Sequence, residues 1–523
     1  MKKIYIKEEF CIGCRLCEIY CQVKHSKSKK IIKAFKKEQP DIISRVLVEE
    51  IGHNSFAIQC RHCADAPCAE ACISGAMCKN DNTGVVTCSE DKCVGCWSCI
   101  MVCPYGVIKR DYSAGKVSLE KVYFKSESFY KDNNFKLILS SKVDFLDEKK
   151  MLAGLSDDNQ ISYKKLLISS GGKPIIPKIR VVEGQNKLVG IGYAGKDHDL
   201  KGQRLLTGEN YSDIKGVFTL TTLEDAIKLK KYIDENNLKS VTILGGGLIG
   251  LKTAEAMLEL GLQITIIELS DRILAASFDK NASEIIENKI EENSGSIFTN
   301  TTVDEIIVTG GKLASVVLRN RKKLDTNLLI IAVGVKPNVE FIQNQLIKLN
   351  NGIVVDDYLK TSMDNIYAAG DVAVSRDRLL NEQKNIAIWP LAIRQGGIAG
   401  MNMSGEKVKY QGGFFMNSVE ILGIPSISIG LNNLDDKASE GIKVFSQFNP
   451  ERGIYRKVTI KDNKVVGIIL VGSIERAGIY CGLISNEIDI SSVAVNIARE
   501  DFGIIQLPAG YRKHLVVGEG IEV

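Results

Sequence analysis

Cysteine spacing constrains this chain more than any other feature of its sequence. Fourteen of its 15 cysteines lie before residue 104, and most of them fall into three runs of four. The runs are CIGCRLCEIYC at 11–21, CRHCADAPCAEAC at 60–72 and CVGCWSCIMVC at 93–103; only the last is followed by proline. Dense, regularly spaced cysteines in a sequence without a signal peptide indicate metal ligands rather than disulfides.

The spacing C-x2-C-x2-C-x3-C-P is typical of ligands for a cubane iron–sulfur cluster. Two-residue gaps let a tight loop bring three thiolates to one cube, while the fourth cysteine enters a helix directed at a second cube. Zinc is the main alternative, but zinc sites commonly use two separated C-x2-C pairs, which leaves the other cysteines unexplained. The predicted ligands are Cys11, Cys14, Cys17, Cys21, Cys60, Cys63, Cys68, Cys72, Cys93, Cys96, Cys99 and Cys103.

Composition limits the remaining classes of function. The 523 residues are 45% hydrophobic and 25% charged, as in a soluble globular protein of several domains. A net charge of +5 is too small to indicate nucleic-acid binding. Because the sequence has neither a bilayer-spanning apolar run nor a signal peptide, we expect a cytoplasmic protein. The one dense basic stretch, KHSKSKKIIKAFKK at 24–37, is either a solvated surface or a docking site for an acidic partner.

The stretch SVTILGGGLIGLKTAEAMLELGLQITIIE at 240–268 predicts a strand, a glycine turn, a helix and a second strand. Gly245, Gly247 and Gly250 would let the backbone approach a pyrophosphate at the helix N-terminus. Glu268 ends the second strand, where a carboxylate accepts ribose hydroxyls and repels a 2′-phosphate, so NADH is favoured over NADPH. A second glycine pattern, at 190–195, is interpreted as a loop because no strand of useful length precedes it.

The cysteine-rich stretches CIGCRLCEIYCQVKH, CRHCADAPCAEACISGAM and CVGCWSCIMVCPYGVIKRD resemble the multi-cluster iron–sulfur subunits of dimethyl sulfoxide reductases, formate hydrogenlyases and carbon monoxide dehydrogenases. In that family four runs make four clusters. The resemblance implies one 4Fe-4S cluster on Cys60, Cys63, Cys68 and Cys103, and a second on Cys72, Cys93, Cys96 and Cys99. The family's fourth run is missing after Arg110, so the run at 11–21 lacks its partner and a third cluster stays open. Cys78 and Cys88 are spare and could complete a site, but their spacing fits no pattern.

Three later segments resemble domain junctions of the two-dinucleotide-domain FAD/NAD(P)H oxidoreductases, in the branch of nitrite and rubredoxin reductases. They are YKKLLISSGGKPIIP (163–177), NLLIIAVGVKPNVEFI (327–342) and TSMDNIYAAGDVA (361–373). The resemblance implies FAD, glycine turns at Gly334 and Gly370, and a hydrogen bond from Asp371 to the ribityl chain. It also implies that the helix in IWPLAIRQGGIAGMNMSG (388–405) points its N-terminus at the flavin.

The stretch from about residue 410 resembles the small interface domain of that family. RKVTIKDNKVVGIILVGSIERAGIYCGLI is expected to form two paired strands around Lys461, Asp462 and Asn463, followed by a helix. Cys481 has no partner cysteine and no C-x4-C pair exists, so we expect no thiol–disulfide mechanism and name no catalytic residue. A homo-oligomer is compatible with this resemblance.

The same flavoprotein family begins with its own glycine fingerprint for FAD, and this sequence has none. Past Tyr112 the sequence resembles a later part of the family, where the helix SESFYKDNN leads to the strand FKLILSSKV at 135–143. We expect FAD to lose part of its phosphate and adenosine contacts, unless the stretch 180–215 replaces them.

Together these patterns predict a multidomain protein: an α+β ferredoxin-like iron–sulfur domain, an α/β Rossmann-like flavoprotein with two dinucleotide-binding domains, and a C-terminal α+β interface domain. The predicted boundaries are 1–115 for the 4Fe-4S domain, 116–215 with 325–408 for the FAD domain, 216–324 for the NAD(H) domain and 409–523 for the interface domain. The predicted function is electron transfer between NADH, FAD and 4Fe-4S clusters. The expected partner is a redox protein, either similar to carbon monoxide dehydrogenase or a ferredoxin or rubredoxin. The alternative is an iron–sulfur electron carrier with a flavin-free, inactive reductase domain.

Overall fold

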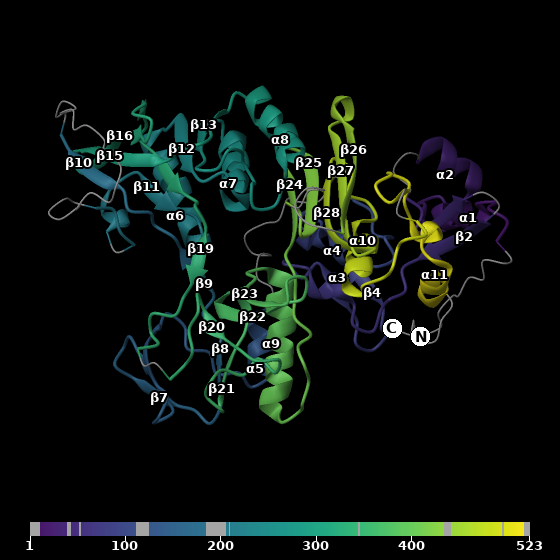
Figure 1. The fold of residues 1–523 in the computed structure, drawn as a ribbon, viewed down its shortest axis with the longest axis horizontal. Coiled ribbons are helices and arrows are strands. Elements are labelled where there is room, and N and C mark those ends of the chain that lie inside the picture. The colour runs from purple at the N-terminus through teal and green to yellow at the C-terminus, as the bar shows by residue number, and fades with distance from the viewer. Residues whose placement is uncertain are drawn as a thin grey trace. The chain divides into compact units, whose positions relative to one another are not determined.

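The computed structural model describes residues 11–38, 43–51, 54–110, 125–184, 205–208, 210–343, 346–433, 441–493 and 496–516. The chain divides into two compact units (Figure 1). Unit 1 comprises residues 1–169, 340–420 and 424–523, and unit 2 comprises residues 170–339 and 421–423. Each unit is described separately.

Unit 2 is built on a five-stranded parallel sheet with helices packed against it. Its strand order is β11 (Val217–Thr219), β18 (Leu329–Ile331), β12 (Ser240–Leu244), β13 (Gln263–Ile267), β14 (Ser296–Phe298). The helices are α6 (Leu223–Asn236), α7 (Leu248–Glu259) and α8 (Lys280–Glu292). The central strands are rich in Ile, Leu and Val and almost wholly buried, as a parallel sheet covered on both faces requires. The predicted strand, turn, helix and strand at 240–268 are therefore confirmed.

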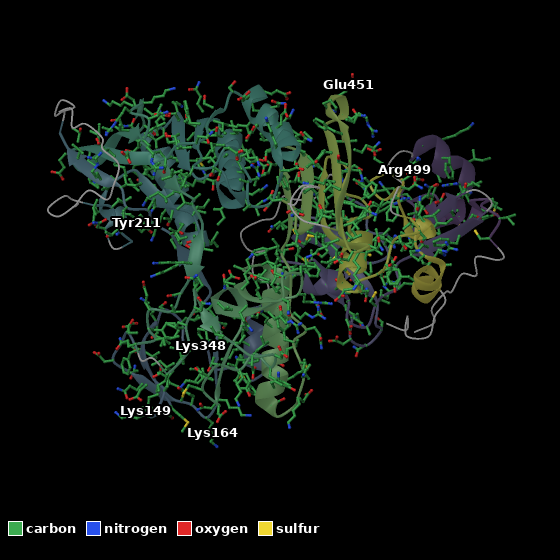
Figure 2. The ribbon with its side chains drawn as sticks, in the orientation of Figure 1. Lys149, Lys164, Tyr211, Lys348, Glu451 and Arg499 are labelled. Atoms are coloured by element: carbon green, nitrogen blue, oxygen red, sulfur yellow. The ribbon has the colours of Figure 1, made fainter. Side chains whose placement is uncertain are left out.

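A second sheet in unit 2 and a short strand pair complete this unit. The sheet has the order β10 (Arg180–Glu183), β15 (Val303–Thr309), β16 (Lys312–Leu318), β17 (Lys323–Asp325), and the short helix η4 covers Tyr211–Asp213. The strands β9 (Gly172–Pro174) and β19 (Val335–Pro337) pair antiparallel. The hydroxyl of Tyr211 lies 3.2 Å from that of Thr219 (Figure 2). Gly190, Gly192 and Gly195 lie outside the described residues.

The first part of unit 1 carries the cysteine runs on short helices and hairpins. Its elements are α1 (Leu16–His25), α2 (Ile31–Lys37), β1 (Val46–Ile51), β2 (Asn54–Gln59), α3 (Pro67–Glu70), β3 (Met77–Lys79), β4 (Val86–Cys88), η2 (Glu90–Lys92) and α4 (Ser98–Val102). The strands β1 and β2 pair antiparallel, as do β3 and β4. Each strand of this part pairs with the strand next to it in the sequence, so the cysteine runs lie on turns between neighbouring elements.

The middle of unit 1 holds small sheets and one long helix. Its elements are α5 (Glu127–Asp132), β5 (Val143–Asp147), β6 (Leu152–Leu155), β7 (Gln160–Ser162), β8 (Leu166–Ile168), β20 (Ile353–Val354), β21 (Ile366–Ala368), η5 (Gly370–Val372), β22 (Ala373–Asp377), β23 (Glu382–Asn385) and α9 (Trp389–Ser404). The strands β8 and β21 form a two-stranded parallel sheet. α9 ends at Gly405, whose φ of +109° closes the helix in the left-handed conformation.

The last part of unit 1 is a five-stranded sheet followed by helices. The order is β24 (Met416–Ile421), β25 (Ile424–Gly430), β28 (Lys464–Val471), β27 (Ile454–Lys461), β26 (Ile442–Asn449), and then come α10 (Ala477–Ser485), η8 (Ile504–Gln506) and α11 (Ala509–Val516). The short helix η6 (Pro450–Arg452), which includes Glu451, joins β26 to β27, and Arg499 pairs through two contacts of 2.8 and 2.9 Å with Asp501 (Figure 2). Asp462 and Asn463 both have positive φ, so the predicted hairpin turn is confirmed.

One strand prediction is wrong. Helix α5 forms within SESFYKDNN as expected, but residues 135–139 are not a strand, and pairing begins only at Val143. Phe135, Leu137 and Leu139 are 57%, 49% and 77% exposed, so this apolar segment has no sheet to enter. A strand needs a neighbour for its backbone hydrogen bonds, and propensity alone does not supply one.

The cysteine-rich part and the C-terminal part of unit 1 share one hydrophobic core. From the first part come Phe56, Ile58, Trp97, Ile100, Met101, Cys103 and Tyr105; from the last come residues of β25, β27, β28 and α10, including Ile429, Val458, Ile468 and Tyr480. A segment of about 100 residues with this many short elements buries little on its own, so it gains stability from a shared core.

Polar contacts join the same two parts. The indole Nε1 of Trp97 donates to Glu420 Oε2 at 2.8 Å, and the hydroxyl of Ser418 donates to the carbonyl of Cys96 at 2.6 Å. Arg110 pairs with Glu475 at 2.7 Å. These bonds fix the loop of the last cysteine run against β24 and the segment before α10.

Within the part of the chain that the structure describes, no helix has the length and hydrophobicity to cross a bilayer.

A close approach between α10 and the last cysteine run yields a stability prediction. A Cβ at Gly478, in the first turn of α10, would overlap the backbone carbonyl of Cys103. Gly478→Ala is therefore expected to lower the free energy of unfolding of unit 1 by about 1–3 kcal/mol. Gly510→Ala in α11 is the control, because its Cβ would meet no atom within 4 Å. Thermal and urea denaturation followed by far-UV circular dichroism would measure both; equal stability of the two variants would contradict the packing described.

Candidate functional site

The glycine turn after β12 has two kinds of glycine. Gly245 has φ +114°, and a Cβ there would overlap the carbonyl of Ala332; a Cβ at Gly250 would overlap the carbonyl of Gly245. These two are needed by the fold itself. Gly247, which precedes α7, has φ −80°, and a Cβ there would meet nothing within 4 Å. The space in front of Gly247 is thus left open at a helix N-terminus, where a phosphate is favoured.

Glu268 lies directly after β13, beside this turn. Its Oε2 accepts a hydrogen bond from the amide of Gly246 at 2.6 Å, and its Oε1 accepts one from the amide of Ser270 at 2.7 Å. Each carboxylate oxygen keeps a lone pair for another donor. The backbone therefore holds this carboxylate in one orientation, next to the turn at which the sequence places the ribose.

The carboxyl ends of three neighbouring strands meet at this edge of the sheet. Leu244 lies in register with Ile331 of β18 and with Ile267 of β13. Gly334, which follows β18, has φ +116°, and its carbonyl accepts a bond from Ile175 at 3.0 Å. Dinucleotides bind at such an edge of open parallel sheets. The structure thus brings Gly245, Gly247, Gly250 and Glu268 together in unit 2.

A second turn of this type lies in unit 1, after β21. Gly370 has φ +78°, and its amide donates to Gln395 Oε1 of α9 at 2.8 Å. Burial raises the pKa of Asp371, and among the described residues no group donates a hydrogen bond to its carboxylate. A half-buried, unpaired carboxylate is costly and fits a site where a ligand hydroxyl would supply the missing donor.

The flavin half of unit 1 is less complete than the nicotinamide half of unit 2. β8 and β21 end in register at Ile168 and Ala368, as neighbouring strands of a dinucleotide sheet do, but the described residues add no third strand. Gly370, Asp371 and α9 fit the ribityl and ring end of FAD. Among the described residues of unit 1, no second glycine turn stands between a parallel strand and a helix to receive its pyrophosphate.

Each of the three cysteine runs forms a loop of similar backbone conformation. In each run, the residue before the second cysteine and the residue before the helix have positive φ. The pairs are Gly13 (+68°) and Arg15 (+55°), His62 (+48°) and Ala66 (+39°), and Gly95 (+65°) and Trp97 (+61°). The third cysteine then occupies the second residue of α1, α3 or α4. Left-handed conformations are uncommon outside glycine, so their repetition at equivalent positions indicates a common constraint.

Two sets of thiols lie within electrostatic range of one another. Burial raises the pKa of Cys68 to about 12, and the charges of Cys103, Cys60 and Cys63 add to that shift. Burial likewise raises the pKa of Cys99, with contributions from Cys96, Cys68, Cys72 and Cys93. Repulsion between neighbouring thiolates raises their pKa values, and a bound metal cation lowers them again.

The first set contains the four ligands that the resemblance implied for one cluster, and the second contains the four implied for the other together with Cys68. The structure describes no group of three or more His, Cys, Asp or Glu side chains that could hold a single metal ion. A cubane places its four thiolates on four different irons, so its ligands need not converge on one point. Backbone amides also face these sulfurs: Met77 donates to Cys72 Sγ at 3.3 Å, and His62 donates to Cys60 Sγ at 3.5 Å. Hydrogen bonds to cysteine sulfurs help to set the reduction potential of an iron–sulfur cluster.

The run at 11–21 is more open than the others. Cys14 and Cys17 are exposed, whereas Cys72 and Cys103 are buried. Burial raises the pKa of Cys17, with a smaller contribution from Cys11. The sulfur of Cys21 accepts a bond from the amide of Arg45 at 3.3 Å.

Sequence patterns missed the position of Cys88. A hydrogen bond with Cys93 and burial raise the pKa of Cys88, and the charges of Cys93, Cys99 and Cys72 add to it. Cys88 therefore lies beside the second ligand set. The signal for it is structural: the hairpin of β3 and β4 pairs Met77 with Cys88, five residues before Cys93.

Two further observations define the surroundings. α3, within the run at 60–72, packs against α9, and the charge of Arg394 on α9 opposes the rise in the pKa of Glu70 that partial burial causes. Cys481 is buried in α10, and burial raises its pKa to about 11, which makes it an unreactive thiol.

Two protein families match this chain. The family described as pyridine nucleotide-disulphide oxidoreductase matches residues 86–396, more than half of the chain, and the rubredoxin NAD+ reductase C-terminal domain matches residues 416–488. The first match begins at residue 86, so it overlaps the last cysteine run.

Three similar proteins illustrate the likeness. The NADH-dependent phenylglyoxylate dehydrogenase subunit epsilon of Aromatoleum evansii is 29% identical, covering 72% of this chain and 82% of that protein. The NADH-rubredoxin oxidoreductase of Clostridium acetobutylicum is 27% identical, covering 68% and 78%. The solved structure of the water-forming NADH oxidase from Lactobacillus brevis, bound to NADH, has a TM-score of 0.60 at 21% identity, covering 73% of this chain and 81% of that chain.

The two kinds of glycine lead to separable effects. Gly250→Ala is expected to lower the free energy of unfolding by about 1–3 kcal/mol, because its Cβ has no room. Gly247→Ala is expected to leave the melting temperature unchanged and to raise the KM for NADH several-fold, because its Cβ would occupy the open space at the helix N-terminus. Thermal denaturation together with steady-state kinetics distinguishes the two. If Gly247→Ala had no effect on KM, the pyrophosphate would not lie at this turn.

The carboxylate of Glu268 sets the expected coenzyme preference. Glu268→Arg is expected to shift the ratio of kcat/KM for NADH over NADPH toward NADPH by about tenfold or more, because a cation replaces an anion beside the ribose. Glu268→Gln keeps an oxygen to accept the Gly246 bond and should shift the ratio less. Unchanged ratios in both variants would mean that Glu268 does not face the ribose.

Proposed function

This chain belongs to the pyridine nucleotide-disulphide oxidoreductase family and is an NADH-dependent oxidoreductase with that family's two-dinucleotide-binding-domain fold, and from this we propose that it passes electrons between NADH, FAD and 4Fe-4S clusters. The clusters would be held by the cysteine runs of unit 1. A flavin supplies the chemistry that this needs, because it exchanges two electrons with nicotinamide and one electron at a time with a cluster.

The residues of unit 2 would bind and orient the nicotinamide coenzyme. The turn at Gly247 and the N-terminus of α7 would hold the pyrophosphate, and Glu268 would accept the hydroxyls of the adenosine ribose. The carboxylate is already held by two backbone amides, so little orientational entropy is lost when the ribose binds.

The residues of unit 1 would bind the flavin and the clusters. Asp371 would accept a ribityl hydroxyl, and α9 would direct its N-terminal dipole at the ring. Cys60, Cys63, Cys68 and Cys103 would hold one cluster. Cys72, Cys93, Cys96 and Cys99 would hold a second.

One observation carries the proposal: the loops of the three runs have left-handed residues at equivalent positions, and thiols from different runs lie close enough to raise one another's pKa. The position of the run at 60–72 supports a redox role, because this run packs against α9 through α3. A cluster there would lie in the same compact unit as α9. The acceptor would be a separate redox protein, either of the carbon monoxide dehydrogenase type or a ferredoxin or rubredoxin, as the name of one relative indicates for that relative.

A second candidate function has its own support. The described flavin half has a two-stranded sheet, and the apolar segment 135–139 lies exposed beside no strand. If FAD does not bind, the chain would be an iron–sulfur electron carrier with an empty reductase domain.

Cofactor analysis separates these functions. Protein purified without oxygen and reconstituted with iron, sulfide and FAD is expected to hold about eight irons, for two 4Fe-4S clusters, and about one FAD per chain. NADH should then bleach the flavin absorbance. Absence of bound FAD would reject the first function, and zinc in place of iron would reject both.

A cysteine variant and its control test the ligand assignment. Cys68→Ser is expected to remove about half of the iron and the matching electron paramagnetic resonance signal, because one thiolate of the first set is lost. Cys78→Ser should retain all of it, since Cys78 is exposed and its thiol lies 3.5 Å from the hydroxyl of Thr87. Equal iron in both variants would contradict the assignment of Cys68.

A further inference from the structure

The surface of α1 and α2 in unit 1 is unusually apolar for an exposed region. α1 buries no residue, and α2 buries only Ala34. The exposed apolar side chains are Ile12 (85%), Leu16 (52%), Tyr20 (65%), Ile31 (49%), Ile32 (68%) and Phe35 (37%). Six large apolar side chains within 24 residues form a patch of the kind that marks an interaction site. We call these six residues, together with the exposed lysines between residues 24 and 37, the basic–apolar face.

Lysines surround this apolar patch. They are Lys24, Lys27, Lys29, Lys30, Lys33, Lys36 and Lys37, and all are exposed. Along α2, Ile31, Ile32 and Phe35 follow one side of the helix, while Lys33, Lys36 and Lys37 follow the next side, by the three- and four-residue spacing of helical neighbours. Figure 1 shows α1 and α2 as two neighbouring helices, and they contact each other.

The nearby carboxylates are engaged mainly by Arg15 and by backbone amides, although the charge of Lys27 also acts on Glu38. Glu18 pairs with Arg15 at 3.2 Å and accepts a bond from the amide of Val48 at 2.7 Å. The two oxygens of Glu38 accept bonds from the amides of Lys27 and Ser28 at 2.7 and 3.0 Å. No described carboxylate forms an ion pair with any of the seven ammonium groups. Residues 24–38 carry seven lysines and one glutamate, a net charge of +6 in 15 residues, whereas the net charge of the whole chain is +5.

The same face carries the most open cysteine run. Cys14 and Cys17 are exposed, and Cys17 stands next to Leu16 in α1. The other two runs contribute the buried thiols Cys72 and Cys103. The run at 11–21 therefore has two exposed thiols, whereas the run at 60–72 has one, Cys60, and the run at 93–103 has none.

We propose that the basic–apolar face docks a small acidic electron-transfer protein beside the cysteine run at 11–21. This inference rests on the proposed function and adds to it the site and the charge of the partner. The lysines would steer an anionic partner to the face and the apolar patch would hold it once bound, which is how charged rims and apolar centres divide these tasks. A second copy of this chain would not fit face to face, because both copies would present the same seven lysines.

Charge reversal tests the docking directly. The full chain, reconstituted as above, is immobilised, and a small acidic bacterial ferredoxin is passed over it at low and high ionic strength. Lys33→Glu/Lys36→Glu is expected to raise the Kd about tenfold or more at low ionic strength, and raising the salt concentration should reduce the difference between variant and parent. Lys228→Glu/Lys239→Glu, on exposed lysines in unit 2, is the matched control with the same change in net charge. Equal Kd values in both double variants would overturn the proposal.

A second variant probes the apolar patch and keeps the test independent of charge. Ile32→Ser is expected to raise the Kd several-fold at both ionic strengths, and it should not affect folding because Ile32 is 68% exposed. Basic cytochrome c should not bind the parent chain. Tighter binding to vesicles of anionic phospholipid than to the ferredoxin would assign the face to a membrane surface instead and reject an acidic protein partner.

Failure of docking and failure of the proposed function give different results. NADH-driven reduction of menadione, a small neutral acceptor, requires the flavin but no docked protein, and should be equal in the parent and in Lys33→Glu/Lys36→Glu. NADH-driven reduction of the ferredoxin should show a raised KM in that variant. A parent chain that binds ferredoxin but does not reduce menadione would reject the proposed function and leave docking intact. A parent that reduces menadione but does not bind ferredoxin would reject docking alone.

Discussion

The packing of α4 against α10 is the interaction on which unit 1 depends. Gly478 brings α10 so close to Cys103 that no side chain fits between the helix and the cysteine backbone. Around this contact, Trp97, Ile100 and Met101 enter the same core as the C-terminal sheet. Cysteine-rich segments of this size usually depend on their metal for stability, because they cannot bury enough apolar surface. Here the C-terminal sheet supplies that surface, so the cysteine loops are held in shape by protein packing as well as by any bound metal.

The shared core lies in the same compact unit as the helix that follows the Ala-Gly-Asp turn. The loops of the runs at 60–72 and 93–103 are anchored by α3 and α4, and α3 also packs on α9, the helix that follows the Ala-Gly-Asp turn. Electron transfer needs fixed separations between cofactors more than it needs motion. The side chains of Phe56 and Ile58 lie in the same buried core as the C-terminal strands, so the cysteine-rich segment and the C-terminal part share side-chain packing.

Among the described residues, the sheet of β8 and β21 in unit 1 has fewer strands than the parallel sheet of unit 2. Unit 2 keeps a complete five-stranded parallel sheet, so its glycine turn and Glu268 are fully supported. In unit 1, β8 and β21 form the described part of the corresponding sheet, and the apolar segment 135–139 stays exposed. A strand-forming sequence becomes a strand only where a partner offers hydrogen bonds, which is a property of the tertiary structure.

The sequence by itself determined whatever depends on local spacing. The βαβ unit at 240–268, the glycine turns and the hairpin around Asp462 follow from residue periodicity and positive-φ requirements, and the structure has them as expected. The grouping of cysteines from different runs came from a resemblance and stays a prediction. Only the tertiary structure decided that Cys88 lies beside Cys93, that residues 135–139 stay unpaired, and that the C-terminal sheet forms a core with the cysteine segment. These three outcomes depend on contacts between residues far apart in the chain or on the absence of a neighbouring strand, and local sequence patterns carry no information about either.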